Sequence, residues 1–470
     1  MVTSLTFWHR VGLRAALYIG VVAVAFEMWA INSTMKIIAA PDALNAMQQY
    51  AWAFTMFSLG QVFSIIVVGR LVDRFGAFKP LAVGTGLFIL GLALAGSAHH
   101  IYTFLAARAV QGLGGGALNI ALMVVIAEVY PGRQRSNMMM WFSFCYMGPA
   151  FVGPGVASFI AVNMGWRYVF WLIIPLMLIA AAVGVKPFFE LYGGRKSRGA
   201  AQGEMPVWAA VAGIGGLAII QAVTQTVSGK VIHAIEWQWI LLAIVGLVAV
   251  GVAMPRLMPA GFWRIRPGMP ALMWVRMTLA GSYAAALNFL VLMLTMARGL
   301  GQHEASWSLA FGATGWALGM MLQSRRWFKV PRDQIIKIGA FITTVCMAGI
   351  GVYAAVGVPG SLVLPVLLVV LVAAGFGMGL AVSSTSLALM TLSPPETIGH
   401  NTSSLQVADG LGSAFFVGVA GAIWAALHVH YSWQVTFAWL YAANGIVALL
   451  ALVLTITRLG HVRNESSGYG

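Results

Sequence analysis

Glu27, Arg108 and Asp409 are ionisable side chains that interrupt long apolar runs of the sequence. Apolar runs of this length are typical of membrane-spanning helices. A charge held in hydrocarbon is costly, so an acid there either pairs with a cation or keeps its proton. We therefore interpret Glu27 as a proton-coupling acid. The alternative is a neutral, hydrogen-bonded glutamate that only packs in the core.

Arg108 differs from the two acids because a guanidinium stays charged at any working pH. We expect it to face a polar cavity, where it pairs with or tunes Glu27; otherwise its long side chain reaches the headgroups. Gln111 and Gly112 follow at i+3 and i+4 and share its helix face, which predicts a polar, close-packed cavity wall. Asp409 is a second candidate for a proton or cation site, the alternative being a solvated position near the cytoplasmic mouth.

The elements that must position these residues are helices that cross a membrane. Of the 470 residues, 60% are hydrophobic and 8% are charged, whereas about a quarter of a soluble domain is charged. A spanning helix satisfies its own backbone hydrogen bonds, as hydrocarbon requires. We predict an all-α polytopic membrane protein with fourteen spans, at residues 14–40, 46–69, 79–98, 101–127, 138–161, 168–188, 206–227, 236–257, 271–298, 305–324, 334–357, 361–391, 402–428 and 433–457. The first run is too long for a secretory signal peptide.

Positive charge is distributed unevenly along the chain, whose net charge is +15. With the N-terminus inside the cell, most Lys and Arg fall in cytoplasmic segments, and the outside segments hold only Lys36, Arg167, Lys230 and Arg298. This bias is the positive-inside rule, so it accounts for the basic chain without nucleic acid as a partner. The sequence predicts a multi-pass protein of the inner (cytoplasmic) membrane with both termini in the cytoplasm.

Sequence motifs for enzyme chemistry do not occur. There is no phosphate-binding loop, zinc-ligand cluster or hydrolase nucleophile motif, and Cys145 and Cys346 fall inside spans without metal-ligand spacing. We therefore expect no enzyme activity, no cofactor and no metal. An ion gradient remains as the energy source, and it supplies about 2.3 kcal/mol per charge for each 100 mV.

The chain is predicted to consist of three parts. Residues 1–190 would form an N-terminal six-helix bundle, which ends at a basic, glycine-rich stretch typical of a linker. Residues 191–269 would hold cytoplasmic linkers and an inserted two-helix hairpin. Residues 270–470 would form a C-terminal six-helix bundle with a short cytoplasmic tail.

The two predicted bundles share a Gly-x-Gly-x-Gly pattern in their fourth spans, at residues 112–116 and 375–379. Small residues at this spacing let helix backbones approach closely in lipid, and internal repeats are common in secondary transporters. Glycine is also frequent in membrane helices generally, which is the alternative reading.

A charged turn is predicted between the second and third spans, at Gly69–Gly76, and it includes Asp73 and Arg74. Because charge is scarce in this chain, we interpret the turn as functional, with Glu128 as a local partner for Arg74 or Arg133; the resemblance described below implies that it latches the cytoplasmic side. A static loop that merely obeys the positive-inside rule is the alternative.

These residues resemble motifs of the major facilitator superfamily, and within it of the fourteen-span drug:proton antiporter group. The charged turn is similar to the family's loop 2–3 motif at Gly69, Leu71, Asp73, Arg74 and Gly76. It departs at Ala77 and Phe78, where the family usually has basic residues.

Three further segments carry the resemblance. Residues 108–114 are similar to the fourth-span motif R-x-x-Q-G-x-G. The fifth-span antiporter motif is matched in part, at Gly148, Gly153 and Pro154, but not at Val156, Ala157 and Ser158. In the first span, Glu27 and Asn32 keep the family's spacing of an acid and an asparagine, with Glu in place of the usual Asp.

The resemblance implies particular roles for these residues. Glu27, with Arg108 and Asp409, would couple transport to protons, and Asn32 would line the substrate cavity with Gln111 and Gly112. The motif residues of the turn and the fifth span, with Glu128, would control gating. Asp73 would contact the start of the helix that carries Asp409, where Asn401-Thr402-Ser403 are good N-cap residues.

The function implied is proton-coupled export of drugs or other lipophilic compounds, cations among them, by alternating access. The fold implied is that of the family, two six-helix bundles plus the hairpin, acting as a monomer on small molecules and protons in a lipid bilayer. Two alternatives stay open: a dedicated exporter of a siderophore, lipid or metabolite, and a transport-inactive binding or regulatory membrane protein.

Overall fold

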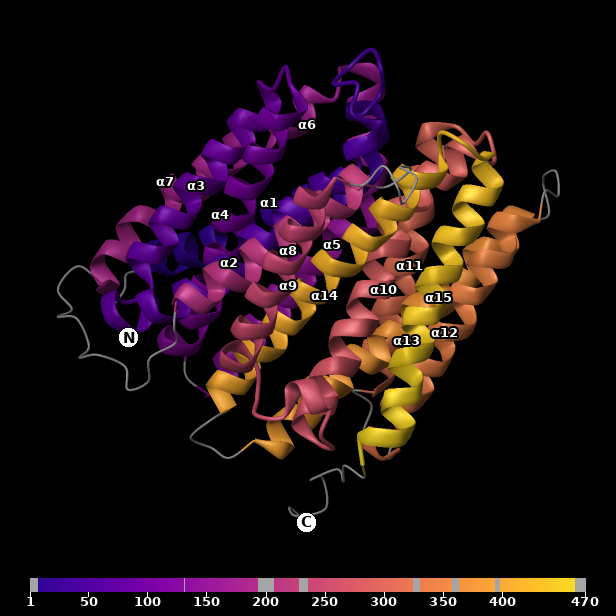
Figure 1. Ribbon diagram of the computed structural model, residues 1–470. Helices are drawn as coiled ribbons and strands as arrows, with labels where there is room; N and C mark the ends of the chain where they lie inside the picture. Colours follow the sequence, from indigo (N-terminus) through magenta and orange to yellow (C-terminus); the bar gives the residue numbers. More distant parts are fainter. Residues whose placement is uncertain are drawn as a thin grey trace. The chain divides into compact units, whose positions relative to one another are not determined.

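The computed structural model describes residues 7–130, 132–192, 207–227, 236–323, 330–356, 363–393 and 398–460. In these ranges the chain forms helices joined by short turns (Figure 1), which confirms the all-α fold. The chain divides into two compact units. Unit 1 comprises Met1–Met47 and Met56–Val207, and unit 2 comprises Gln48–Thr55 and Trp208–Gly470. The predicted three-part division stays a prediction.

Thirteen of the described helices are long and apolar enough to cross a membrane. The predicted span 305–324 forms a helix of 22 residues, α11, but its composition is less apolar than that of the thirteen. The helices of unit 1 are α1 (Phe7–Ile38), α2 (Trp52–Phe75), α3 (Phe78–Gly96), α4 (Ile101–Val129), α5 (Gly132–Asn163), α6 (Arg167–Trp171) and α7 (Ile173–Tyr192). Those of unit 2 are α8 (Val207–Val227), α9 (Trp237–Leu257), α10 (Met269–Met296), α11 (Gln302–Gln323), α12 (Arg332–Ala355), α13 (Val363–Leu392), α14 (Ile398–Leu427) and α15 (Trp433–Arg458).

In unit 1, α1 packs against α5 and α7, and α3 packs against α4. Helix α4 approaches two neighbours with its bare backbone. A Cβ atom at Gly112 would overlap the carbonyl group of Phe57 in α2, and one at Gly114 would overlap the backbone of Phe88 in α3. Alternate glycines therefore set α2 and α3 against two faces of α4.

Unit 2 repeats this arrangement. Helix α10 packs against α14 and α15, and α13 packs against α11 and α12. A Cβ atom at Gly375 would overlap the carbonyl group of Gly312 in α11, and one at Gly377 would lie 2.7 Å from the carbonyl oxygen of Gly339 in α12. The two Gly-x-Gly-x-Gly segments thus perform the same packing task in both units, as an internal repeat requires.

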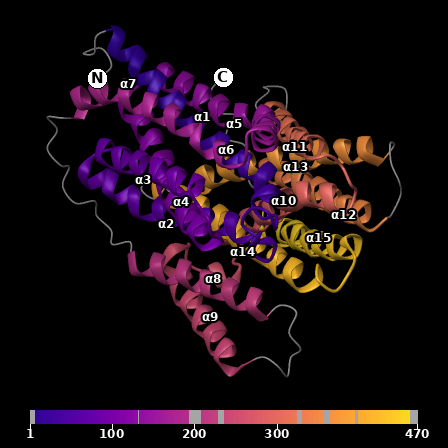
Figure 2. The same ribbon diagram turned by 90° about the horizontal axis from the view of Figure 1, so that it is seen from above.

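Helices α8 and α9 form a hairpin that lies between α1–α7 and α10–α15 in sequence (Figure 2). They meet where a Cβ atom at Gly216 would lie 2.7 Å from the carbonyl oxygen of Gly246. The side chain of Gln221 on α8 lies against Gly418 of α14. Helix α8 therefore packs against α14 at the position where that helix has no side chain.

Two local expectations are wrong. The charged segment Gly69–Phe75 is not a turn but the end of α2, and Gly76 terminates the helix with φ +78°. The residues of Gly69–Phe75 continue the helix. Gly76 ends it because a glycine in the left-handed conformation commonly terminates a helix. Asn401 and Thr402 are likewise not N-caps, because α14 already begins at Ile398. The predicted linker beyond Tyr192 and the basic residues 325–329 lie outside the described residues.

The glycine contacts predict which substitutions destabilise the protein. Gly375→Ala places a Cβ atom against a backbone carbonyl that cannot move aside, so we expect it to cost about 1–3 kcal/mol, as overpacking does. Gly86→Ala in α3 is the matched control because no atom lies within 4 Å of its Cβ position. Thermal unfolding in detergent, monitored by size-exclusion chromatography, should give a lower midpoint for Gly375→Ala than for Gly86→Ala. Equal midpoints for both would contradict this packing.

Candidate functional site

Glu27 and Arg108 form an ion pair inside unit 1. Glu27 lies on α1 and Arg108 on α4, and a guanidinium nitrogen of Arg108 donates a hydrogen bond to Oε1 of Glu27. Both side chains are only 1% exposed. The structure therefore brings together the two charges that the sequence placed within apolar spans of the first half.

Two further groups hold the Arg108 guanidinium in place. Its Nη1 also donates to Oε1 of Gln111, one turn along α4, over 2.6 Å. Its Cζ lies 4.6 Å from the centre of the Phe57 ring of α2, a distance typical of a cation–π contact. Three helices thus fix one cation.

Several buried polar atoms around this pair have no hydrogen-bond partner among the described residues. They are Oε2 of Glu27, Nε2 of Gln111 and Oδ1 of Asn32. An unsatisfied buried acceptor costs about 1–3 kcal/mol. Oε2 of Glu27 and Oδ1 of Asn32 are thus acceptors, and Nε2 of Gln111 is a donor, that no described residue satisfies.

Asn32 and Gly112, both expected in the cavity, are buried. The amide nitrogen of Asn32 is 3.5 Å from the carbonyl oxygen of Met28, which is a weak contact. Gly112 packs against the backbone of Phe57. Its role in the described structure is therefore close helix packing around the ion pair.

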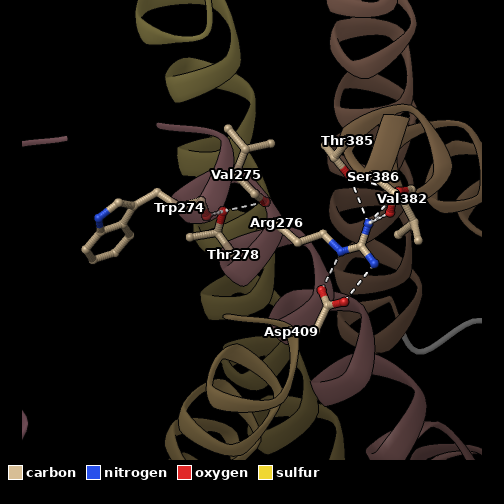
Figure 3. Close-up of polar contacts among 8 residues, drawn as sticks. All are labelled: Trp274, Val275, Arg276, Thr278, Val382, Thr385, Ser386 and Asp409. Atoms are coloured by element: carbon tan, nitrogen blue, oxygen red, sulfur yellow. Dashed lines mark hydrogen bonds and ion pairs between the residues drawn. The ribbon is translucent and has the colours of Figure 1, made fainter. Parts of the chain in front are cut away.

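A second ion pair lies in unit 2 (Figure 3). On α10, Arg276 donates from Nε to Oδ1 of Asp409 over 2.5 Å and from Nη2 to Oδ2 over 2.7 Å. Its remaining nitrogen, Nη1, donates to α13, at Thr385 Oγ1 over 2.8 Å and at the carbonyl oxygen of Val382. Bidentate geometry of this kind is the strong form of an arginine–carboxylate pair.

Sequence reasoning named Asp409 but did not give it a partner. The available signal was that Arg108 and Arg276 are the two arginines within spans, one in each half. An arginine in a span needs an acid, and Asp409 is an acid in the same half as Arg276.

The predicted gating residues lie at helix ends. Arg74 is exposed at the end of α2, with its Cζ 5.2 Å from the centre of the Phe75 ring. Glu128 lies in the last turn of α4, and the side chain of Asp73 lies outside the described part of the structure. The contacts of Asp73 with α14 and of Glu128 with an arginine stay predictions.

The fifth-span residues flank the first helix. Gly153 is buried, and a Cβ atom there would lie 3.6 Å from Phe26 and from Trp29, the near neighbours of Glu27 on α1. Pro154 is buried beside it inside α5, and Gly148 is exposed. One glycine of this motif thus lies close to the acid-bearing helix.

A narrow recess opens beside these helices, with about 10 Å³ of space open to a water-sized molecule. Its lining residues, all in unit 1, are Val21, Val24, Gln61, Leu118, Asn119, Leu122, Phe142 and Tyr146. Val24 is one turn from Glu27 along α1, and Gln61 is one turn from Phe57 along α2. Sequence reasoning did not select Gln61, Asn119 or Tyr146, although each is a polar residue within an apolar span.

Curated relatives of this chain are transporters. A probable triacylglyceride transporter of Mycobacterium leprae is 31% identical over 180 residues, which are 36% of this chain and 35% of the relative. The Bacillus subtilis multidrug transporter protein MdtP is 26% identical over 36% of this chain and 31% of its own length. These matches span about a third of each relative. A triacylglyceride transporter of Mycobacterium tuberculosis is 27% identical over 87% of this chain and 82% of its own length.

Solved structures share the fold at low identity. A peptide transporter in complex with sulfate superposes with a TM-score of 0.70 at 15% identity, over 96% of each chain. A D-xylose–proton symporter gives 0.64 at 16% identity, over 96% of this chain and 98% of its own.

The family model of the Major Facilitator Superfamily matches residues 17–417. Its match includes both ion pairs and both glycine segments. The chain therefore belongs to the Major Facilitator Superfamily of membrane transporters.

Proposed function

We propose that this protein exports lipophilic small molecules across the inner membrane in exchange for protons, with Glu27 as the coupling acid. The observation that supports it most is the state of this carboxyl group. One of its oxygens binds Arg108, and the other is buried without a partner among the described residues. Such an oxygen can hold a proton without losing any other hydrogen bond.

Proton binding would change the forces between α1 and α4. While Glu27 is ionised, the charges of the two side chains attract each other strongly because water is excluded. A proton on Oε2 removes the charge–charge attraction, and the hydrogen bond from Arg108 to Oε1 of Glu27 then joins a charged group to a neutral one. In this proposal, weakening of the ion pair lets the substrate cavity switch the side of the membrane to which it is open. Release of the proton to the cytoplasm restores the ion pair.

Export rather than import is favoured by the relatives, which include multidrug and triacylglyceride transporters. Broad drug export and dedicated lipid export are both within this proposal. The match over 87% of the chain to a triacylglyceride transporter favours lipid export as the second candidate. A deletion strain separates them: a multidrug exporter changes the resistance to several unrelated compounds, whereas a dedicated exporter changes one lipid class.

Replacing Glu27 by Gln removes the titratable proton and preserves the shape of the side chain. We expect Glu27→Gln to abolish transport driven by a pH gradient in proteoliposomes, while the protein still inserts and elutes as a single peak. Glu190→Gln is the control, because Glu190 pairs with His9 at a position where its side chain is 46% exposed. Undiminished proton-driven transport by Glu27→Gln would refute the coupling role.

The buried pair also predicts a pattern of stability. Arg108→Gln alone leaves Glu27 as an uncompensated buried charge and should cost about 3–5 kcal/mol. Combined with Glu27→Gln, the same substitution should cost less, because no charge is then left without a partner. Thermal unfolding of the two single variants and the double variant measures this coupling, and purely additive losses would mean that the pair is not energetically linked.

Asp409, the second proton candidate, has both oxygens bound to Arg276. We propose that its pairing with Arg276 holds α14 to α10. Asp409→Asn should therefore lower the unfolding temperature but retain transport that depends on the pH gradient and on Glu27. If Asp409→Asn instead folds normally and uncouples transport from protons, Asp409 is a coupling residue.

A further inference from the structure

The connector between α9 and α10, residues 258–268, is basic and aromatic, and the proposed function does not use it. We infer that the connector and the adjoining ends of α8 and α9 bind the headgroup of an anionic phospholipid from the surrounding bilayer. All of these residues belong to unit 2.

The connector is held in place by α10. Its centre is the 3-10 helix η4 (Phe262–Arg264), which packs against α9 and α10. The Phe262 ring stacks on Trp274 of α10 with the ring centres 5.0 Å apart, and the indole N–H of Trp274 donates to the carbonyl oxygen of Phe262 over 2.8 Å. Left-handed residues flank η4, at Gly261 with φ +89° and at Ile265 with φ +46°. That conformation is unfavourable for a β-branched residue such as Ile265, so packing must fix the shape of the connector.

Three arginines are exposed at this end of the hairpin. Arg256 is in the last turn of α9, Arg264 ends η4, and Arg266 follows two residues later. The stem of the Arg266 side chain lies against Gly261, where a Cβ atom would be 2.7 Å from Cδ of Arg266. Among the described residues, no hydrogen bond or ion pair engages the guanidinium groups of Arg264 and Arg266. Their N–H donors are therefore available to a ligand.

Two exposed tryptophans accompany these arginines. Trp208 in the first turn of α8 and Trp263 in η4 are each 49% exposed. Cζ of Arg256 lies 4.6 Å from the centre of the Trp208 ring, so the start of α8 and the end of α9 lie at the same level. Tryptophan at the ends of membrane spans is typical of the headgroup region. The arginines thus lie at the depth of the lipid phosphates.

The charge of this part of the chain favours an anion. Residues 207–296 include five basic residues but only one acid, Glu236. Glu236 precedes the first residue of α9, at the opposite end of this helix from Arg256. The linker before α8, residues 193–206, adds three basic residues and one acid in sequence. Positive charge is therefore in excess around the connector.

Helix α14 reaches the same region without neutralising it. Oγ of Ser404 donates to the carbonyl oxygen of Leu257, the last residue of α9, over 3.2 Å. The one acid in α14 is Asp409, and both of its oxygens are bound to Arg276.

A phospholipid fits these observations better than a soluble anion. Arginine binds phosphate through two parallel hydrogen bonds, whereas the exposed indole rings contact the lipid region next to the phosphate. The positive-inside rule predicts that this end of the hairpin is cytoplasmic, and basic groups on that membrane surface attract anionic lipids. A lipid bound there would link the ends of α8 and α9 to the start of α10.

Native mass spectrometry of the full chain in a neutral detergent, titrated with phosphatidylglycerol or phosphatidylcholine, tests this inference. We expect the wild type to bind phosphatidylglycerol at least about tenfold more tightly, since each arginine near a membrane surface strengthens binding of anionic lipid about fivefold. Arg264→Gln combined with Arg266→Gln should remove most of this preference. An unchanged affinity of the double variant for phosphatidylglycerol would overturn the inference.

Two further double variants serve as controls. Lys186→Gln combined with Arg458→Gln removes the same charge from exposed positions near the ends of α7 and α15, and it should keep the preference. An equal loss in this control would refute a defined site, because only the total charge would then matter. Arg264→Lys combined with Arg266→Lys keeps the charge and should retain part of the preference. Size exclusion shows that each variant is folded.

A soluble headgroup fragment distinguishes a lipid from a free phosphate compound. Glycerol 3-phosphate carries the phosphate without acyl chains, so at equal concentration it should not displace bound phosphatidylglycerol. Displacement at equal concentration would mean that the site takes a soluble phosphate compound and would refute the lipid site.

Discussion

A carboxylate and a guanidinium that share a site without water are the constraint on which unit 1 depends. The Glu27–Arg108 pair is tolerable only because α1, α2 and α4 meet closely enough to exclude lipid and to surround the arginine with an acid, an amide and an aromatic ring. That closeness in turn requires glycine at the crossing of α2 and α4. Charge and packing therefore support each other: the helices hold the pair, and the pair links two of the helices.

The two units share a helix arrangement but place their ion pairs differently. In unit 1 the pair joins α1 to α4, and one carboxyl oxygen is left without a partner. In unit 2 the pair joins α10 to α14, reaches α13 through further hydrogen bonds, and uses both carboxyl oxygens. We relate the first arrangement to proton exchange and the second to fixed structure.

Much of this was predictable from sequence. The lengths of the apolar runs predicted the helices. The scarcity of charge drew attention to Glu27 and Arg108, because a lone charge in a span requires a partner in the same half. The pairing of Arg276 with Asp409, 133 positions apart, was not predicted although the same argument applies to it, because Asp409 was interpreted as a separate proton or cation site. The end of α2 was misplaced because Arg70–Phe75 are compatible with either helix or turn, and Gly76 alone ends the helix. Recess residues such as Asn119 are polar without a motif, so only packing reveals them.

The alternating glycines of α4 and α13 have a mechanical consequence. Where main chains touch directly, no side-chain rotamer can absorb a displacement, so we expect the contacts of α4 with α2 and α3, and of α13 with α11 and α12, to be rigid. Helix α5, by contrast, contains two prolines and meets α1 through the side chains of Phe26 and Trp29. Substitutions that change the size of a side chain are therefore easier to accommodate at the α1–α5 contact than at the glycine contacts of α4 and α13.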